Sequence, residues 1–240
     1  MVLKVVGTGS SGNAYILSDG ISDVILDAGM SIKEIKQALG FDVTKIRGVL
    51  ISHIHKDHTQ ALEKLLMQGV LAYMNPTVKE AYTDYYNARS VKPFEVFGLA
   101  ENITGLGFDV PHDNVPCYGY YLKWNDRRIL YLTDLEYCPI DLSKITPTDV
   151  IVECNYCEDM VDMEAENIRH KLLGHMGLKT CKGFIKHVAS TELKNVILCH
   201  RGLDTSDPDE ITKTISTVAE TAHVYVARKG LTIELGKGHL

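Results

Sequence analysis

Four potential metal ligands lie within the six residues HIHKDH, at positions 53–58. They are His53, His55, Asp57 and His58. Neutral imidazole and carboxylate groups are good ligands for Zn²⁺, Mn²⁺ and Fe. One ion takes about four ligands, and a catalytic ion keeps a position for water. Four ligands from so short a segment would crowd one ion, so we expect two ions that share the segment and are completed by residues elsewhere.

The sequence on both sides predicts that this cluster lies on a loop. The preceding segment IRGVLIS has the composition of a buried strand. The following segment TQALEKLLMQG predicts an amphipathic helix with Leu62, Leu65 and Leu66 on one face. A loop that leaves a strand and enters a helix is a usual place for a site in layered α/β folds.

Strands and helices alternate along the rest of the chain. SIKEIKQALGF predicts a helix in which Ser31 is the N-cap, Glu34 completes a capping box and Gly40 ends the helix. PTVKEAYTDYYNAR and DMEAENIRHKLLG also have helical patterns, and strand follows strand from about residue 94 to 133. No linker rich in Pro, Gly or Ser interrupts the pattern. We therefore expect residues 1–240 to form a single domain of two packed β-sheets flanked by helices.

Composition limits the classes of protein that fit. The net charge of −6 lacks the basic footprint of a general nucleic-acid binder, although metal ions can supply local positive charge to an enzyme that acts on nucleic acid. The first residues, MVLKVVGTGSSGN, contain no long apolar run. We therefore expect no signal peptide, no membrane partner and a cytoplasmic location. The six cysteines, Cys154 and Cys157 among them, are too sparse for a disulfide scaffold and are expected to be reduced.

The histidine motif resembles a known signature. HIHKDH is similar to the HxHxDH motif of the metallo-β-lactamase-fold hydrolases, and three later residues resemble the remaining family ligands in order: His112 in FDVPHD, Asp134 in LYLTDL and His200 in VILCHRG. GTGSSGNAYIL resembles the opening of the YycJ-like branch, small phosphodiesterases and exonucleases related to tRNase Z. The resemblance spans residues from about 3 to 202. It implies an αββα four-layer sandwich of two mixed β-sheets flanked by helices, with metals at the sheet edge.

The resemblance also implies two divalent metal ions per chain, Zn or Mn, with Fe as a further option. It assigns seven ligands to them: His53, His55 and His112 to the first, Asp57, His58 and His200 to the second, and Asp134 between the two. Two metals roughly 3.5–4 Å apart suit the hydrolysis of a phosphodiester, because they activate a bridging water and neutralise phosphoryl charge. Asp57 would also orient the resulting hydroxide.

A leaving alkoxide needs a proton, and His175 in LLGHMG resembles the non-ligand histidine of the tRNase Z relatives. Glu153 in IVECN is a candidate to hold it, which would make a positioned general acid. Each residue also has a structural interpretation. A histidine beside glycine can cap a helix end or lie at the surface, and a carboxylate at a strand end often satisfies backbone donors.

Three further residues are weaker candidates. Asn13, with Ser11, is expected to place an amide near the substrate, although GSSGN is also simply a tight loop. Arg201 is expected to meet a phosphate, and a surface ion pair would need the same residue. Asp27 in ILDAG either supports a ligand histidine or only forms a turn.

The leading hypothesis is a phosphodiesterase that cleaves nucleic acid with a metal-bridging hydroxide. The alternative is a hydrolase of a small substrate on the same fold: a cyclic nucleotide or other small phosphodiester, a thioester or a lactone. A diiron oxidoreductase of this fold would need a flavin partner domain, for which the sequence has no counterpart. A non-catalytic binding protein would be expected to have lost ligands. The oligomeric state is not encoded in any motif.

Overall fold

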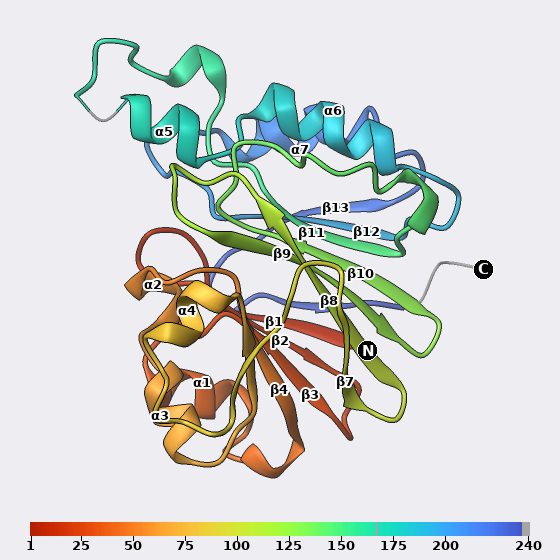
Figure 1. The fold of residues 1–240 in the computed structure, drawn as a ribbon. Coiled ribbons are helices and arrows are strands. Elements are labelled where there is room, and N and C mark those ends of the chain that lie inside the picture. The colour runs from red at the N-terminus through yellow and green to blue at the C-terminus, as the bar shows by residue number, and fades with distance from the viewer. Residues whose placement is uncertain (167, 237–240) are drawn as a thin grey trace. The chain divides into compact units, whose positions relative to one another are not determined.

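The computed structural model describes residues 1–166 and 168–236 and contains two mixed β-sheets of seven strands each, flanked by helices (Figure 1). The first sheet has the order β14-β1-β2-β3-β4-β5-β6, with β1 (Val2–Gly7), β2 (Ala14–Ser18), β3 (Asp23–Leu26), β4 (Ile46–Ile51), β5 (Ala72–Met74), β6 (Ala88–Ser90) and β14 (Thr232–Glu234). The second has the order β13-β12-β11-β10-β9-β8-β7, with β7 (Val96–Ala100), β8 (Ile103–Val110), β9 (Cys117–Trp124), β10 (Arg127–Leu132), β11 (Asp149–Glu153), β12 (Asn195–Cys199) and β13 (His223–Val226). These helix-flanked mixed sheets confirm the predicted fold class.

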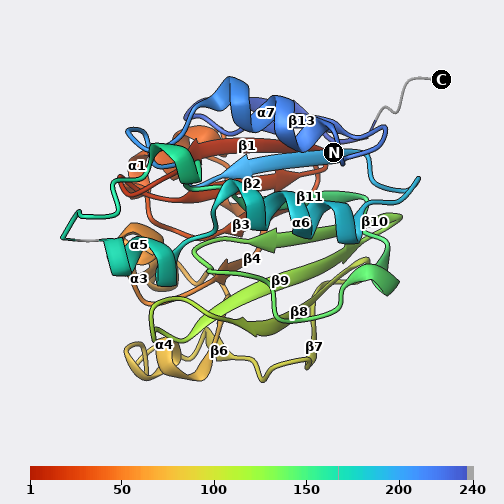
Figure 2. The same ribbon diagram turned by 90° about the horizontal axis from the view of Figure 1, so that it is seen from above.

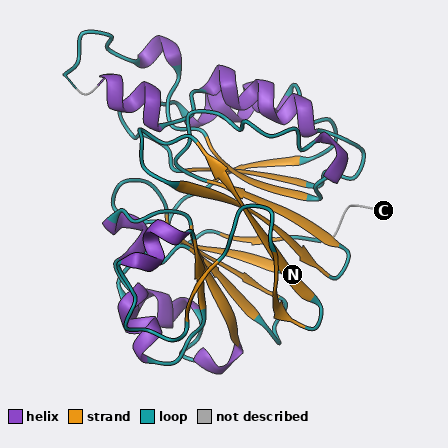
Figure 3. Ribbon diagram, in the orientation of Figure 1, coloured by secondary structure: helices purple, strands orange, loops and turns teal. Residues whose placement is uncertain are grey.

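The helices connect the strands in two groups. The first group is α1 (Ile32–Ala38), α2 (Lys56–Thr59), α3 (Leu62–Met67) and α4 (Pro76–Glu80), and the second is α5 (Ile168–Gly174), α6 (Leu178–Val188) and α7 (Pro208–Ser216). Three short 3₁₀ helices span Val43–Lys45, Ser143–Ile145 and Glu158–Met160. Figure 3 draws these helices in purple, and Figure 2 shows the same elements turned by 90°.

The chain forms two compact units. One comprises Met1–Phe108 and the residues from Arg228 onward, and the other comprises Asp109–Ala227. In the first unit the apolar faces of α1, α3 and α4 pack against the first sheet, with Ile35, Leu62 and Val78 fully buried. In the second unit α6 and α7 cover β11 to β13 with buried faces of their own (Figure 1).

Local sequence signals are confirmed where they have a specific chemical partner. Ser31 caps α1, its hydroxyl accepts from the Glu34 amide, and the Glu34 carboxylate accepts from the Ser31 amide. Gly40 follows the helix with a φ of 66°, in the left-handed region that a helix stop favours. Leu62, Leu65 and Leu66 are buried together, as their spacing predicts.

Three predicted helices are longer than the observed ones. The predicted helix after residue 58 is broken into α2 and α3, because the amide of Ala61 donates to the carbonyl oxygen of Ala28 instead of continuing the helix. The helix from Pro76 ends at Glu80. The following segment is held in place by Asn87, whose side-chain amide donates to two carbonyl groups near α3. The helix predicted for DMEAENIRHKLLG is reduced to Ile168–Gly174, with a 3₁₀ turn before it and residue 167 outside the described part.

Parallel pairing brings strand ends to common edges. In the first sheet β3, β4, β5 and β6 run parallel, and in the second β10, β11, β12 and β13 do so. The carboxyl ends of adjacent parallel strands meet at one edge, so the loops that follow them lie close together within each sheet. Each sheet therefore has one edge at which side chains distant in sequence converge.

Gly29 allows the loop after β3 to touch the loop that carries Asp57. A Cβ atom on Gly29 would lie 1.5 Å from the Asp57 carbonyl oxygen and 2.7 Å from the Asn13 amide nitrogen. Both neighbours are backbone atoms, which cannot swing aside. Backbone hydrogen bonds form across this close contact. The Asn13 amide donates to the Asp57 carbonyl at 2.7 Å, and the Gly29 amide donates to the Asn13 carbonyl at 2.8 Å.

Replacing Gly29 with alanine should therefore lower the free energy of unfolding by about 3 kcal/mol, as expected for overpacking against rigid backbone. The measurement is urea unfolding followed by circular dichroism. Gly183→Ala is the matched control, because Gly183 lies in α6 with open space around it and should gain up to about 1 kcal/mol of helix stability. Equal stability of the two variants would contradict the close approach.

Candidate metal centre

The histidine motif follows the end of strand β4. This strand lies between β3 and β5 in parallel register, and the chain leaves it at the fully buried residues Ser52 and His53. His55 is then the N-cap of the one-turn helix α2, which carries Asp57 and His58. His58 is fully buried, whereas the Asp57 side chain is 28% exposed. The four predicted ligands of this unit therefore lie together at the carboxyl edge of the first sheet.

Asp27 holds this loop in place through hydrogen bonds to Ser52 and His58. It follows β3 with a φ of 56°, a left-handed conformation that is uncommon outside glycine. Its buried carboxylate accepts from the Ser52 amide at 2.8 Å, from the Ser52 hydroxyl at 2.9 Å and from His58 Nδ1 at 2.8 Å. Of the two interpretations for Asp27, the structure therefore shows the contact with a predicted ligand histidine.

These bonds determine where the protons lie on two histidines. An ionised carboxylate only accepts, so His58 Nδ1 and the Ser52 hydroxyl both donate to Asp27. The hydroxyl has then used its proton, and it accepts from His53 Nδ1 at 3.0 Å. With Nδ1 protonated, both His53 and His58 carry their lone pair on Nε2, which is the form a metal ligand needs.

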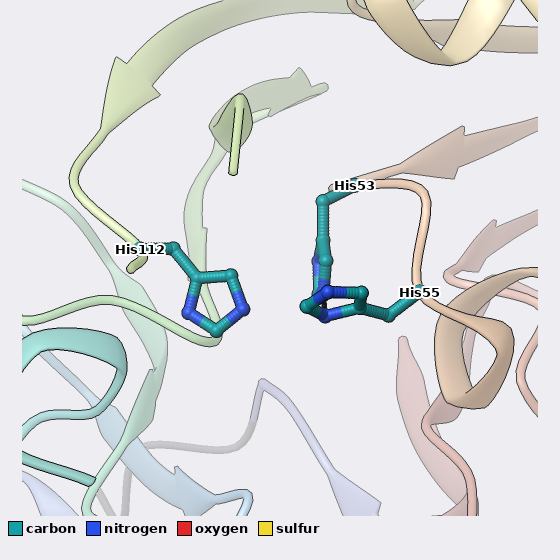
Figure 4. A group of neighbouring side chains, drawn as sticks. All are labelled: His53, His55 and His112. Carbon is teal, nitrogen blue, oxygen red and sulfur yellow. Dashed lines mark hydrogen bonds between the residues drawn. The ribbon is translucent and has the colours of Figure 1, made fainter. Parts of the chain in front are cut away.

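His55 completes the pair with His53. His53 Nε2 lies 2.8 Å from His55 Nδ1, and the two rings meet edge to face with centroids 4.5 Å apart. Figure 4 shows these two rings on the loop after β4; His112, which is drawn with them, comes from the loop after β8. Two imidazole nitrogens at this separation fit two ligands of one ion.

Asn13 is placed inside the glycine-rich loop. It is fully buried, and its side chain bonds the amide and the carbonyl of Gly9 at 2.9 and 3.0 Å. Its amide nitrogen also lies 3.0 Å from His58 Nε2. Asn13 therefore closes the loop and contacts the predicted ligand His58, and its contact with substrate stays a prediction.

In the second unit, three candidate site residues lie at the ends of three adjacent parallel strands. Asp134 lies two residues beyond β10, Glu153 is the last residue of β11, and His200 follows β12. Asp134 and His200 have φ values of 49° and 47° and are almost fully buried. Left-handed residues after β10 and β12, the two strands on either side of β11, are a local strain of the kind that clusters at functional sites.

Glu153 is the hydrogen-bonding centre of this edge. One carboxylate oxygen, Oε1, accepts from His175 Nδ1 at 2.7 Å and from His200 Nδ1 at 2.8 Å. The other, Oε2, accepts from the amides of Leu135 and Met176 at 3.0 and 3.1 Å. Burial raises the pKa of Glu153, but His175 and His200 outweigh it and hold the pKa below its usual value. Glu153 is therefore a buried carboxylate that stays ionised.

His175 has the surroundings of an acid. Its side chain is 13% exposed, and its ring stacks on that of His200 at 5.2 Å between centroids. Burial lowers the pKa of His175, but the charge and hydrogen bond of Glu153 outweigh that effect and raise the pKa above its usual value. Because Nδ1 donates to Glu153, the other nitrogen is the one that can exchange a proton with a ligand.

His112 is held by a backbone carbonyl. Its Nδ1 donates to the carbonyl oxygen of Gly174 at 2.6 Å, which again leaves the lone pair on Nε2. Burial lowers the pKa of His112. A histidine must be neutral to bind a metal, so the lowered pKa favours that role.

Several contacts in this unit are not evident from the sequence motifs. Asn155, two residues after Glu153, donates to the Glu153 carboxylate at 3.2 Å and to the His200 carbonyl at 2.8 Å. His170, which has no counterpart in the family motif, pairs with Asp113 at 2.6 Å. Asn155 could have been found from its place at the end of IVECN, but nothing in the sequence pairs residues 113 and 170.

Arg201 faces its own loop. Its guanidinium donates to the carbonyl and hydroxyl oxygens of Ser206 at 3.0 and 3.1 Å, which ties the loop after β12 together. The structure thus gives this arginine an intramolecular partner. Its contact with a phosphate stays a prediction.

The donor set of each unit fits a divalent metal. The first unit offers three imidazoles and one carboxylate, and the second offers two imidazoles and one carboxylate. Nitrogen and oxygen donors of this kind suit Zn²⁺, Mn²⁺ and Fe. In His53, His58, His112 and His200 the Nδ1 atom donates to a protein acceptor. This outer hydrogen bond is characteristic of metal-binding histidines.

The family model described as a beta-lactamase superfamily domain matches residues 22–201. The chain therefore belongs to the beta-lactamase superfamily and is an enzyme of the metallo-β-lactamase-fold hydrolases. Among curated proteins it is 25% identical to exodeoxyribonuclease YycJ of Bacillus anthracis, over 90% of this chain and 88% of that protein.

Solved structures share the fold. The metallo-β-lactamase-fold protein YhfI of Bacillus subtilis superposes with a TM-score of 0.74 at 18% identity, covering 97% of this chain and 98% of that one. The short form of human tRNase Z superposes with a TM-score of 0.70 at 14% identity, covering 99% and 100%. Among the residues that the structure describes, no helix is long and apolar enough to cross a membrane.

Asp27→Asn tests the anchor of the first unit. The amide keeps the shape of the side chain but loses the charge and one acceptor, so it should loosen His58 and lower the affinity for Zn²⁺ about 10- to 100-fold. Competition with a coloured chelator measures that affinity. Asp42→Asn, at an exposed turn, is the control and should leave the affinity unchanged. Equal affinities in the two variants would contradict the supporting role of Asp27.

Proposed function

We propose that this hydrolase is a dinuclear metal-dependent phosphodiesterase that cleaves nucleic acid as an exonuclease. Two lines support the proposal. The curated relative that aligns over nine-tenths of the chain is named an exodeoxyribonuclease. The observation that carries most weight is the His175–Glu153 pair at 2.7 Å, because a phosphodiester has a poor leaving group that needs a proton. A thioester expels a thiolate, which leaves without a proton, so its hydrolysis has less need of such an acid.

We take residues 1–240 as one catalytic domain. His53, His55 and His112 would hold one ion, Asp57, His58 and His200 would hold the other, and Asp134 would be shared. Zinc or manganese fits this donor set best, and iron is also compatible. When bound, two such ions lower the pKa of a shared water molecule and neutralise charge on the phosphoryl oxygens.

The residues of the chain have separate tasks around this centre. Asp57, whose side chain is 28% exposed, would orient the attacking water. His175 would donate its proton from Nε2 to the leaving oxygen, while Glu153 stabilises the imidazolium and holds the ring in place. Asn13 and Arg201 would contact the substrate backbone only if their present partners, Gly9 and Ser206, are exchanged or shared.

A substrate panel tests the proposal. Protein purified without chelator should carry close to two metal ions per chain by elemental analysis. With added Mn²⁺ or Zn²⁺ it should degrade labelled DNA or RNA, offered single-stranded and double-stranded with both kinds of 5′ end. Nitrocefin, a thioester and bis-p-nitrophenyl phosphate are run in parallel. Hydrolysis of nitrocefin or the thioester, with all phosphodiesters left intact, would overturn the proposal in favour of a small-substrate hydrolase.

His175→Ala tests the general acid. The variant should lose about 10²- to 10⁴-fold in kcat on a nucleic acid, the usual contribution of a positioned acid. It should keep nearly full kcat on bis-p-nitrophenyl phosphate, whose leaving group needs no proton. His187→Ala, an exposed histidine on α6, should leave both rates unchanged. Equal losses on the two substrates would show that His175 is structural instead.

The pH dependence should agree with this role. His175 has a raised pKa and acts in its protonated form, so the kcat ratio of nucleic acid to bis-p-nitrophenyl phosphate should be highest at low pH. The ratio should fall as pH rises through that pKa, which lies above the ordinary value near 6.5. In His175→Ala the ratio should be low and flat.

A further inference from the structure

A cavity of about 420 Å³ lies on the first unit, next to the loop that carries the histidine motif. One wall comes from α2 and α3, with Lys56, Gln60 and Glu63, and the other comes from the turns after α4, with Tyr82 and Tyr85. Its volume falls within the range of small-molecule sites. The reaction described above does not use any of these residues.

Helix α2 carries both this cavity and two predicted metal ligands. Lys56, Thr59 and Gln60 are spaced i, i+3 and i+4, so they share one side of the helix and line the cavity. Asp57 and His58 point around the other side, because each residue turns the helix by about 100°. The cavity and the predicted metal ligands Asp57 and His58 therefore lie on different sides of the same one-turn helix.

Two tyrosines form an aromatic corner in the cavity. The ring centroids of Tyr82 and Tyr85 are 6.5 Å apart, and the ring planes meet at 51°. Both rings are half-buried, and each is held in place by its surroundings. The Tyr85 hydroxyl donates to Glu63 at 2.9 Å, and Tyr82 packs against the hydrophobic core of the first sheet. Fixed aromatic faces in an otherwise polar cavity are suited to stack a flat ring.

The charges of the residues that line the cavity favour a nucleobase over a phosphate group as its occupant. Glu63 and Asp84 are acidic, and Lys56 is the one basic group among the residues that line it. Two carboxylates repel a phosphate, but they accept hydrogen bonds from the amino groups of a nucleobase. Lys56 lines the cavity and is followed in α2 by the predicted metal ligand Asp57, so its ammonium group is the one available to a phosphate of a nucleotide that reaches from the cavity toward that ligand.

We propose that this cavity is a nucleobase subsite, in which Tyr82 and Tyr85 stack the base of a nucleotide next to the cleaved phosphodiester and Lys56 meets its phosphate. This inference rests on the proposed phosphodiesterase function and specifies its substrate as a strand with an unpaired base near the cleavage point. An unpaired base is required because a base within a duplex cannot enter a cavity and stack there. Asp84 favours bases that carry an amino group over thymine.

Cleavage kinetics test the subsite. Tyr82→Leu should raise KM for a single-stranded oligonucleotide about 5- to 150-fold, as expected for loss of one base–aromatic stack, with kcat nearly unchanged. An abasic residue next to the cleaved bond should have the same effect on the wild-type protein. The two changes should not add, because both remove the same stack. Tyr82→Phe keeps the ring and should keep the wild-type KM.

Tyr86→Leu is the matched control. Tyr86 is 81% exposed, lies on the same segment and does not line the cavity, so its loss should leave KM unchanged. Should Tyr82→Leu fail to fold, Lys56→Met and Asp84→Asn replace it, because both side chains are exposed. Lys56→Met should raise KM for every sequence, whereas Asp84→Asn should reduce the preference for guanine over thymine.

A binding measurement separates this inference from the proposed function. Metal-free protein in chelator is titrated with a fluorescent single-stranded oligonucleotide, and its anisotropy is compared with that of an abasic one. Weaker binding of the abasic strand, lost in Tyr82→Leu, supports the subsite even if no cleavage occurs. Cleavage that is indifferent to both the abasic residue and Tyr82→Leu would overturn the subsite and leave the phosphodiesterase proposal standing.

Discussion

Each unit of this protein depends on a buried carboxylate that fixes the protons of its histidines. Asp27 accepts from His58 Nδ1 and, through the Ser52 hydroxyl, orders the proton of His53. Glu153 accepts from Nδ1 of both His175 and His200. A histidine has two chemically distinct nitrogens, and the hydrogen bond on one decides what the other can do. The two carboxylates thus fix which ring nitrogen of these imidazoles carries a proton and which carries a lone pair.

Such carboxylates are costly to bury, and the fold supplies the compensation. Glu153 lies at the end of β11 between two parallel neighbours, and four of its donors come from the loops after β10 and β12 and from the segment around His175. Asp27 follows β3 and receives its donors from the loop after the adjacent strand β4. A buried charge is stable when its hydrogen-bonding capacity is filled, and parallel strand ends bring enough donors to one place.

The backbone is strained at the same points. Asp27, Asp134 and His200 all have φ between 47° and 56°, and all follow strands at the carboxyl edges of the sheets. Such conformations persist only where the surrounding structure enforces them. The packing at Gly29 is an example of such surroundings, since no side chain larger than a hydrogen atom fits between the two loops there. The chemistry of the site and the tightness of the packing therefore have the same origin.

The sequence by itself determined the types of the predicted ligands, the order of the motifs, the α1 capping box and the two-sheet fold class, because these are encoded in local spacing and in one resemblance. It placed Asp134, Glu153 and His200 at strand ends but could not show that one carboxylate would serve two histidines. Only the tertiary structure decided that, since the partners are 22 and 47 residues apart and meet through strand pairing. It also shortened three predicted helices, where contacts such as those of Asn87 and Ala61 outweighed local helix propensity.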